Sequence, residues 1–84
     1  MRIVIELDVA EIGAALHPRR RMVILQREDG FYAFAEQYYY VSQYDGEIIA
    51  EGWATLPADG IYANCQMAEI QGRAAFSHRH EVTY

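Results

Sequence analysis

Two Asp-Gly pairs constrain the fold of this chain more than any other feature. Asp29-Gly30 follows a strand-like segment over residues 22–27, and Asp45-Gly46 separates two further segments of this kind, residues 31–44 and 47–55. Asp-Gly suits the positive φ angles of a tight turn between antiparallel strands. The two turns therefore predict three consecutive strands joined as an antiparallel meander.

The segment before the meander predicts one strand and one short helix. Residues 2–7 indicate a strand, because three β-branched residues follow one another there. Asp8 stands three positions before Glu11, a spacing close to that of a capping box, so a helix is expected over residues 9–17. Pro18 would end this helix, because proline cannot continue the backbone hydrogen-bond pattern.

The segment after the meander predicts a second helix. Asn64 is a good helix cap, and residues 65–76 are mostly good helix formers. Residues 77–84 alternate weakly and could add an edge strand or stay loose. The helix face expected to cover the sheet has apolar residues at helical spacing: Met67, Ile70 and Ala74.

These elements predict one α+β domain over residues 1–84, in the order β-α-β-β-β-α, with the helices packed on one face of a mostly antiparallel sheet. Alternation divides the strand that begins at Phe31 into two faces. Small residues predict that the helices cover the face of Phe31, Ala33 and Ala35. The opposite face, expected to be uncovered, carries Tyr32, Phe34 and Glu36. A bulge near Gln37 would exchange the two faces beyond it.

Charge is distributed unevenly along the 84 residues, whose net charge is -5. All seven basic residues are arginines, and none lies between Glu28 and Gly72. That span carries eight acidic residues: Glu28, Asp29, Glu36, Asp45, Glu47, Glu51, Asp59 and Glu69. Such an acidic block repels nucleic acid and favours a basic partner. We therefore expect no direct nucleic-acid binding.

The opening residues do not resemble a signal peptide, because acids at positions 6 and 8 break the apolar run. No uncharged stretch approaches the roughly 20 residues that a membrane-spanning helix needs. Cys65 is the only cysteine, so no disulfide can form within the chain. A cytoplasmic protein with no membrane contact is expected.

Aromatic residues mark the candidate binding surface. Tyr38, Tyr39 and Tyr40 are adjacent, so they cannot all point into one core. Regular alternation would place Tyr39 in the core and leave its two neighbours on the opposite face, and a bulge would invert this assignment. Tyrosine and tryptophan dominate binding hot spots. The expected partner-binding residues are Tyr38, Tyr40, Tyr44, Trp53, Glu36, Glu47 and Glu51.

Catalytic and metal sites are weakly indicated. His78 and His80, with Glu81 beside them, could lie on one side of a strand, but zinc needs a third or fourth ligand, and a solvated tail is the preferred interpretation. No histidine lies near Cys65 in sequence, so a small buried side chain is preferred over a reactive thiol. Neither a phosphate-binding loop nor a nucleophile-elbow motif is present. We expect no metal, cofactor or enzymatic activity.

The segment from Arg21 to Phe76 resembles a group of small, uncharacterised bacterial proteins. The shared pattern is Leu-Gln-Arg, an Asp-Gly turn, alternating aromatics ending in Glu, a tryptophan strand, and GIYAN before a helix. The resemblance implies no particular activity. Size and charge predict a non-enzymatic inhibitor, comparable with immunity or anti-CRISPR proteins, that binds a basic partner. The alternative is a structural domain that forms a homodimer through its tyrosines.

Overall fold

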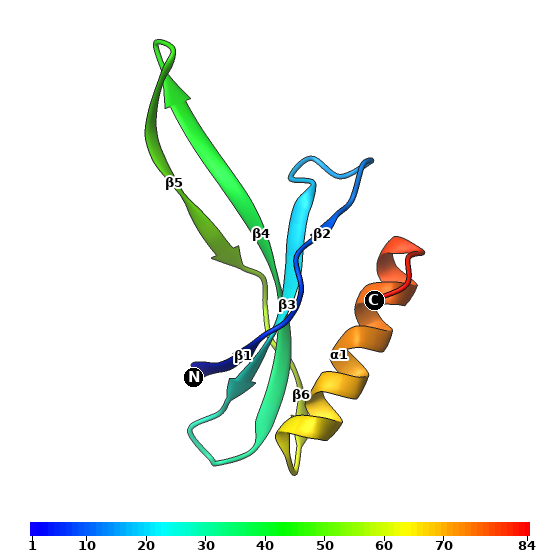
Figure 1. The fold of residues 1–84 in the computed structure, drawn as a ribbon. Coiled ribbons are helices and arrows are strands. Elements are labelled where there is room, and N and C mark those ends of the chain that lie inside the picture. Colours follow the sequence, from blue (N-terminus) through cyan, green and yellow to red (C-terminus); the bar gives the residue numbers. More distant parts are fainter.

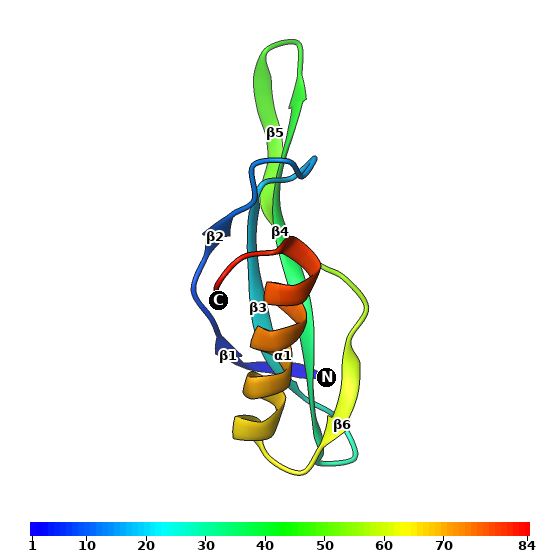
Figure 2. The same ribbon diagram turned by 90° about the vertical axis from the view of Figure 1, so that its right-hand side faces the viewer.

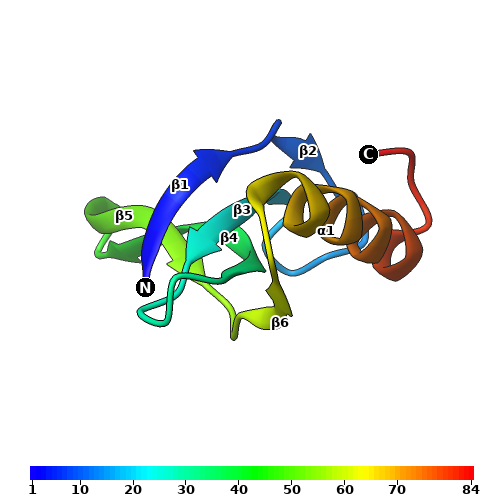
Figure 3. The ribbon, with the colours of Figure 1, turned by 90° about the horizontal axis from the view of Figure 1, so that it is seen from below.

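The computed structural model describes all 84 residues as one curled antiparallel sheet with a single helix (Figures 1–3). The sheet order is β1-β3-β4-β5, while β2 pairs with β3 and β6 pairs with β4. The α+β class and the antiparallel sheet are thereby confirmed. The elements are β1 (Arg2–Glu6), β2 (Ala10–Glu11), β3 (Arg19–Gln26), β4 (Tyr32–Tyr44), β5 (Glu47–Thr55), β6 (Asp59–Tyr62) and α1 (Cys65–His80).

The meander of β3, β4 and β5 forms where the Asp-Gly pairs predict it. Gly30 has a φ of 87°, and the strands on either side pair from Gln26 with Tyr32 onward. At the second turn Asp45 and Gly46 have φ angles of 54° and 83°. Positive φ at both turn residues is what a two-residue type I′ hairpin requires, and the second turn meets this, whereas at the first turn only Gly30 has a positive φ.

The helix expected over residues 9–17 is absent, and this prediction was wrong. Ala10 and Glu11 instead form β2, which pairs with the first two residues of β3. The N–H of Ile12 donates to the carbonyl of Pro18 at 2.7 Å, so the segment turns back on itself. A helix of nine residues is marginal by itself. Burial of Leu7 and Ile12 in the core stabilises the observed conformation more than the weak capping signal would stabilise a helix.

The C-terminal helix begins where the sequence predicts and continues further. The side chain of Asn64 accepts a hydrogen bond from the N–H of Met67 at 2.9 Å, which caps the first turn. The helix runs to His80 and ends at Glu81, which adopts a left-handed φ of 55°. Residues 77–80 are therefore helical, and the possible edge strand in the tail does not form.

The face of α1 that packs on the sheet differs from the predicted one. Met67, Ile70 and Ala74 are exposed, whereas the buried residues are Ala68, Gly72 and Phe76. A Cβ on Gly72 would lie 3.0 Å from Cβ of Phe34, so the glycine allows the helix to approach β4 closely.

The helix also covers the opposite face of β4 from the one predicted. Phe34 belongs to the main core, while Ala35 packs on the other face in a small cluster with Val23 and Leu25. Figure 2 shows α1 lying along β3 and β4 on this single face. Close approach is achieved by small residues on the helix, not by small residues on the sheet. The main core comprises Leu7, Ile12, Met22, Ile24, Phe34, Ala68 and Phe76.

Tyr84 fixes the end of the described chain to the sheet. Its hydroxyl accepts from the N–H of Met22 at 3.0 Å and donates to the carbonyl of Asp8 at 2.7 Å. Its ring stacks on Phe76 with 4.2 Å between ring centres. The tail thus joins β3 and the β1–β2 connection to the helix.

One end of the molecule is a hairpin that projects beyond the rest of the sheet. The pairing of β3 with β4 ends at Arg20 and Tyr38, but β4 and β5 continue together to Tyr44 and Glu47. This projecting part, residues 39–53, is here named the arm, and Figure 1 shows it extending beyond the helix and the rest of the sheet. The molecule consequently measures 47 × 29 × 17 Å.

Candidate protein-binding surface

The arm exposes an unusual amount of apolar surface. Every residue from 41 to 50 is exposed, including 74% of Tyr44 and 65% of Ile49. Val41 and Ile48 are also among the exposed large apolar residues. A two-stranded hairpin is at best marginally stable alone in water, and large exposed apolar patches mark interaction sites. The tip of the arm is therefore the strongest candidate binding surface.

Cross-strand pairing assigns the arm residues to two faces. Tyr39 pairs with Trp53, and Val41 pairs with Glu51, so these four side chains share one face. The opposite face carries Tyr38 and Tyr40, which pair with Ala54 and Gly52. Beyond Ser42 the register shifts at a bulge, and regular alternation ends there.

At the root of the arm, arginines from β3 cover the face of Tyr39 and Trp53. Cζ of Arg21 lies 4.2 Å from the centre of the Trp53 ring, and Cζ of Arg19 lies 5.5 Å from that of Tyr39. The two aromatic rings meet edge-on with centres 5.3 Å apart. Burial and the neighbouring carboxylate of Glu51 raise the pKa of Tyr39. The rings are thus held by cation–π contacts at half-buried positions.

The other face of the root is covered by the turn before β3. The ring of His17 stacks on Tyr38 with 4.5 Å between centres, and Cζ of Arg20 lies 5.6 Å from the same ring. Tyr40 follows with its ring over Gly52. The predicted contrast between a core Tyr39 and exposed neighbours was wrong, since Tyr38, Tyr39 and Tyr40 are all half-buried.

Glu36 does not lie on the exposed surface, and this expectation is corrected. Its side chain is 0% exposed and binds three groups at once. Arg20 Nη1 donates at 2.6 Å, Arg79 Nη1 donates at 2.7 Å, and His80 Nε2 lies 3.0 Å away. Because β3, β4 and α1 each contribute, this cluster connects the helix end to the sheet and is not available to a partner.

The cluster keeps Glu36 ionised. Burial alone would raise the pKa of this carboxyl. Hydrogen bonds from Arg20 and His80, together with the charge of Arg79, outweigh the effect of burial, so the pKa lies below its ordinary value. A buried carboxylate with this many donors has its lone pairs satisfied.

Ion pairs leave seven of the twelve acidic residues without a basic contact, and three of these seven lie on the arm. Six of the seven arginines contact a carboxylate, and Arg2 contacts the amide oxygen of Gln26 instead. The arm carries Asp45, Glu47 and Glu51, and none of these three contacts a basic group. The arm is therefore acidic as well as apolar, and its charge is free to act on a partner.

His78 and His80 both lie in the last turn of α1, but their side chains do not lie together. His80 faces Glu36, whereas His78 is exposed two positions away. No group of three His, Cys, Asp or Glu residues is arranged to hold a metal ion. Cys65 stands half-buried at the first position of α1.

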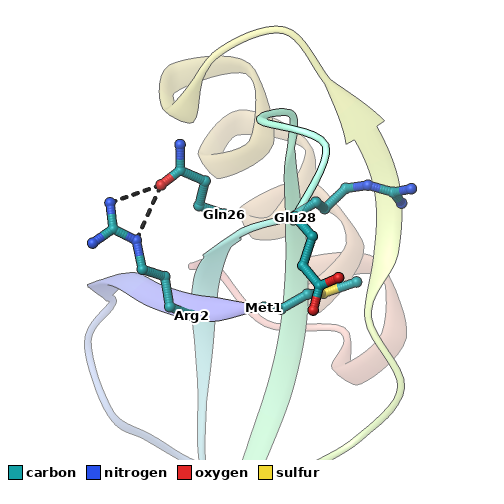
Figure 4. Close-up of a pocket in the computed structure, with 5 residues that line it drawn as sticks. Met1, Arg2, Gln26 and Glu28 are labelled. Carbon is teal, nitrogen blue, oxygen red and sulfur yellow. Dashed lines mark hydrogen bonds between the residues drawn. The ribbon is translucent and has the colours of Figure 1, made fainter.

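A hollow of about 340 Å³ lies at the opposite end from the arm (Figure 4). In this view Arg2 reaches Gln26, with its Nη2 2.7 Å from the amide oxygen, and Met1 and Glu28 line the same hollow. The remaining lining residue is Arg27. The hollow brings no histidine or cysteine near the one carboxylate, so it does not assemble a recognisable set of acid, base and nucleophile.

Sequence reasoning missed the cluster around Glu36, although part of its signal is readable. The Asp29-Gly30 turn sets the β3–β4 register, which places Arg20 opposite Tyr38 and Met22 opposite Glu36. A charged residue in the apolar run of β4, diagonal to an arginine, indicates a buried ion pair. The contribution of Arg79 and His80 comes from 43 and 44 positions away and has no local signal.

No protein-family model, curated protein or solved structure matches this chain. Its single helix, of 16 residues, lacks the length and apolar character that crossing a bilayer would require.

Proposed function

We propose that this chain is a non-enzymatic binding domain whose arm docks on a basic surface of another protein. The observation that carries the proposal is the exposed tip, where Val41, Tyr44, Ile48 and Ile49 stand among carboxylates that have no basic partner in the chain. Apolar and aromatic residues supply contact energy, while unpaired charge steers the encounter.

The charge of the arm indicates the kind of target. A surface that attracts carboxylates also attracts phosphates, so the arm fits a protein site that otherwise holds nucleic acid. An inhibitor that occupies such a site, in the manner of an anti-CRISPR or immunity protein, is the corresponding class. Of the residues expected from sequence to bind, Tyr40, Tyr44, Glu47, Glu51 and Trp53 belong to the arm and are retained.

The same arm supports the alternative of a homodimer less well. A symmetric contact would bring the three carboxylates of one arm beside those of the second copy, which is unfavourable. Six of the seven arginines that could neutralise them already contact carboxylates within their own chain. A second copy therefore offers the arm only Arg2 as an arginine without a carboxylate partner.

The test compares three baits in an extract of the source cells: the wild type, an arm variant and a helix variant. The arm variant is Tyr44→Ser with Ile48→Ser and Ile49→Ser. The helix variant, Met67→Ser with Ile70→Ser, removes exposed apolar groups from α1 and serves as the matched control. We expect the wild type and the helix variant to retain one basic protein that the arm variant loses.

Two results would contradict the proposal. Equal capture by all three baits would show that the arm is not the binding surface. Sedimentation that shows a dimer of the wild type but a monomer of the arm variant would favour the homodimer instead. Circular dichroism melts confirm that all three baits are folded.

A further inference from the structure

The arm offers backbone hydrogen-bonding groups as well as side chains. β5 is the terminal strand of the sheet, so its outer edge is unpaired from Glu47 to Thr55. The bulge interrupts the ladder between Ser42 and Gln43, opposite Ala50 and Ile48. The longest regular stretch of this open edge is therefore residues 50–55.

Sheets protect exposed edges with charged side chains such as lysine, with proline, with β-bulges or with a covering segment. The β-bulge of this hairpin falls between Ile48 and Ala50, so it lies at the end of the 50–55 stretch and not within it. β5 contains neither lysine nor proline, and no other element of the chain pairs with its outer side. Its only charges are Glu47 and Glu51, which repel a second acidic strand and attract a basic one.

The sheet itself shows which kind of strand fits beside these aromatics. β3 brings three consecutive arginines to the root of the arm, where Arg19, Arg20 and Arg21 lie over Tyr39, Tyr38 and Trp53. An arginine-bearing strand is thus already the neighbour that covers this aromatic surface. Cation–π contact with arginine and pairing with carboxylates explain the fit.

We infer that the partner binds as an extended, arginine-rich segment that adds a strand to the outer edge of β5 over residues 50–55. This inference rests on the proposed function and specifies how the arm binds. An arginine opposite Glu51 would pair with its carboxylate, which has no basic partner in the chain, on the face of Trp53. On the other face, Ala54 is small and the ring of Tyr40 lies over Gly52, so large apolar residues of the segment would pack beside that ring.

The segment is therefore expected to alternate arginine with large apolar residues. A labelled peptide that alternates arginine and valine serves as the probe, and fluorescence anisotropy measures its binding to the full chain. Three control peptides separate the contributions. One replaces arginine with glutamate, one replaces valine with serine, and one keeps every side chain but is N-methylated at each residue.

Strand addition predicts that the N-methylated peptide binds about tenfold or more weakly than the parent, because it cannot donate backbone hydrogen bonds. The glutamate peptide should not bind, and the serine peptide should bind more weakly. In the protein, Glu51→Gln should weaken binding of the parent peptide. Glu28→Gln, which changes an exposed acid outside the arm, should leave that binding unchanged. Hydrogen exchange should slow at alternate amides of β5 and stay unchanged in β1.

Equal binding of the parent and N-methylated peptides would overturn strand addition, as would protection of β1 instead of β5. The absence of any peptide binding would also overturn it. None of these results changes the conclusion from the capture experiment, because that experiment tests only the side chains at the tip of the arm. If capture depends on the arm but N-methylation changes nothing, the arm binds a basic protein without adding a strand.

Discussion

Arg79, in the last turn of α1, donates a hydrogen bond to Glu36 on β4 across 2.7 Å. The two residues are 43 positions apart. The carboxylate of Glu36 also contacts Arg20 and His80, and it has no exposed area. Helix, sheet and the root of the arm are therefore fixed at one point. Arg19 and Arg21 also cover Tyr39 and Trp53 at the root of the arm, and beyond these contacts the arm has no support except its own ladder.

Removing the charge of Glu36 should destabilise the fold. Glu36→Gln leaves Arg20 without its buried counter-charge, and breaking one partner of a buried ion pair costs about 3 kcal/mol. Urea denaturation followed by circular dichroism measures the loss. Glu47→Gln, at an exposed position on the arm, is the control and should change the free energy of unfolding by less than about 0.5 kcal/mol. Equal effects from the two variants would contradict the structural role of Glu36.

The same carboxyl predicts an acid dependence of stability. The pKa of Glu36 is lower in the folded state than the ordinary value of 4.5, so its contribution is complete above that value. As pH falls through the folded pKa, the carboxylate is protonated and the contribution is lost. The difference in unfolding free energy between wild type and Glu36→Gln should therefore shrink below pH 4.5. A difference that stays constant from neutral to strongly acidic pH would refute this assignment.

Gly72 should tolerate no larger side chain. A Cβ there would already lie 3.0 Å from Cβ of Phe34, which is attached directly to the backbone of β4 and cannot swing away. Gly72→Leu is expected to lower the free energy of unfolding by about 1–3 kcal/mol through overpacking, although leucine is the better helix former. Ala74→Leu on the exposed side of α1 is the matched control, and its melting temperature should not fall.

The hydroxyl of Tyr84 should stabilise the fold measurably. Tyr84→Phe keeps the ring stacked on Phe76 but removes the acceptor for the N–H of Met22 and the donor to Asp8. The expected loss is about 1 kcal/mol, since a partly buried donor is left unpaired. Tyr44→Phe deletes a hydroxyl at an exposed position and should have no effect in the same thermal melts. Faster hydrogen exchange at Met22 in the Tyr84 variant would identify the cause.

Local chemistry allowed the meander and the start of α1 to be predicted from sequence. Gly30 at the first turn and the Asp45-Gly46 pair at the second adopt positive φ through their own local preference, and Asn64 binds an amide only three residues away. The aromatic, acidic character of residues 39–53 is likewise visible in composition. These features depend on neighbours along the chain, so the sequence by itself determined them.

Only the tertiary structure decided which faces meet and which acids remain free. The helix buries Gly72 and not Ile70, because the fit against Phe34 depends on close approach and not on hydrophobicity alone. Glu36 and Glu51 look equivalent in sequence, yet Arg79 and His80 reach the first from the far end of the helix and no basic group reaches the second. The helix forecast at Asp8 failed for the same reason, since burial of Leu7 and Ile12 against distant residues outweighs a local cap. Contacts between residues far apart in the chain have no local signature, and in this protein they determine which surface is left for a partner.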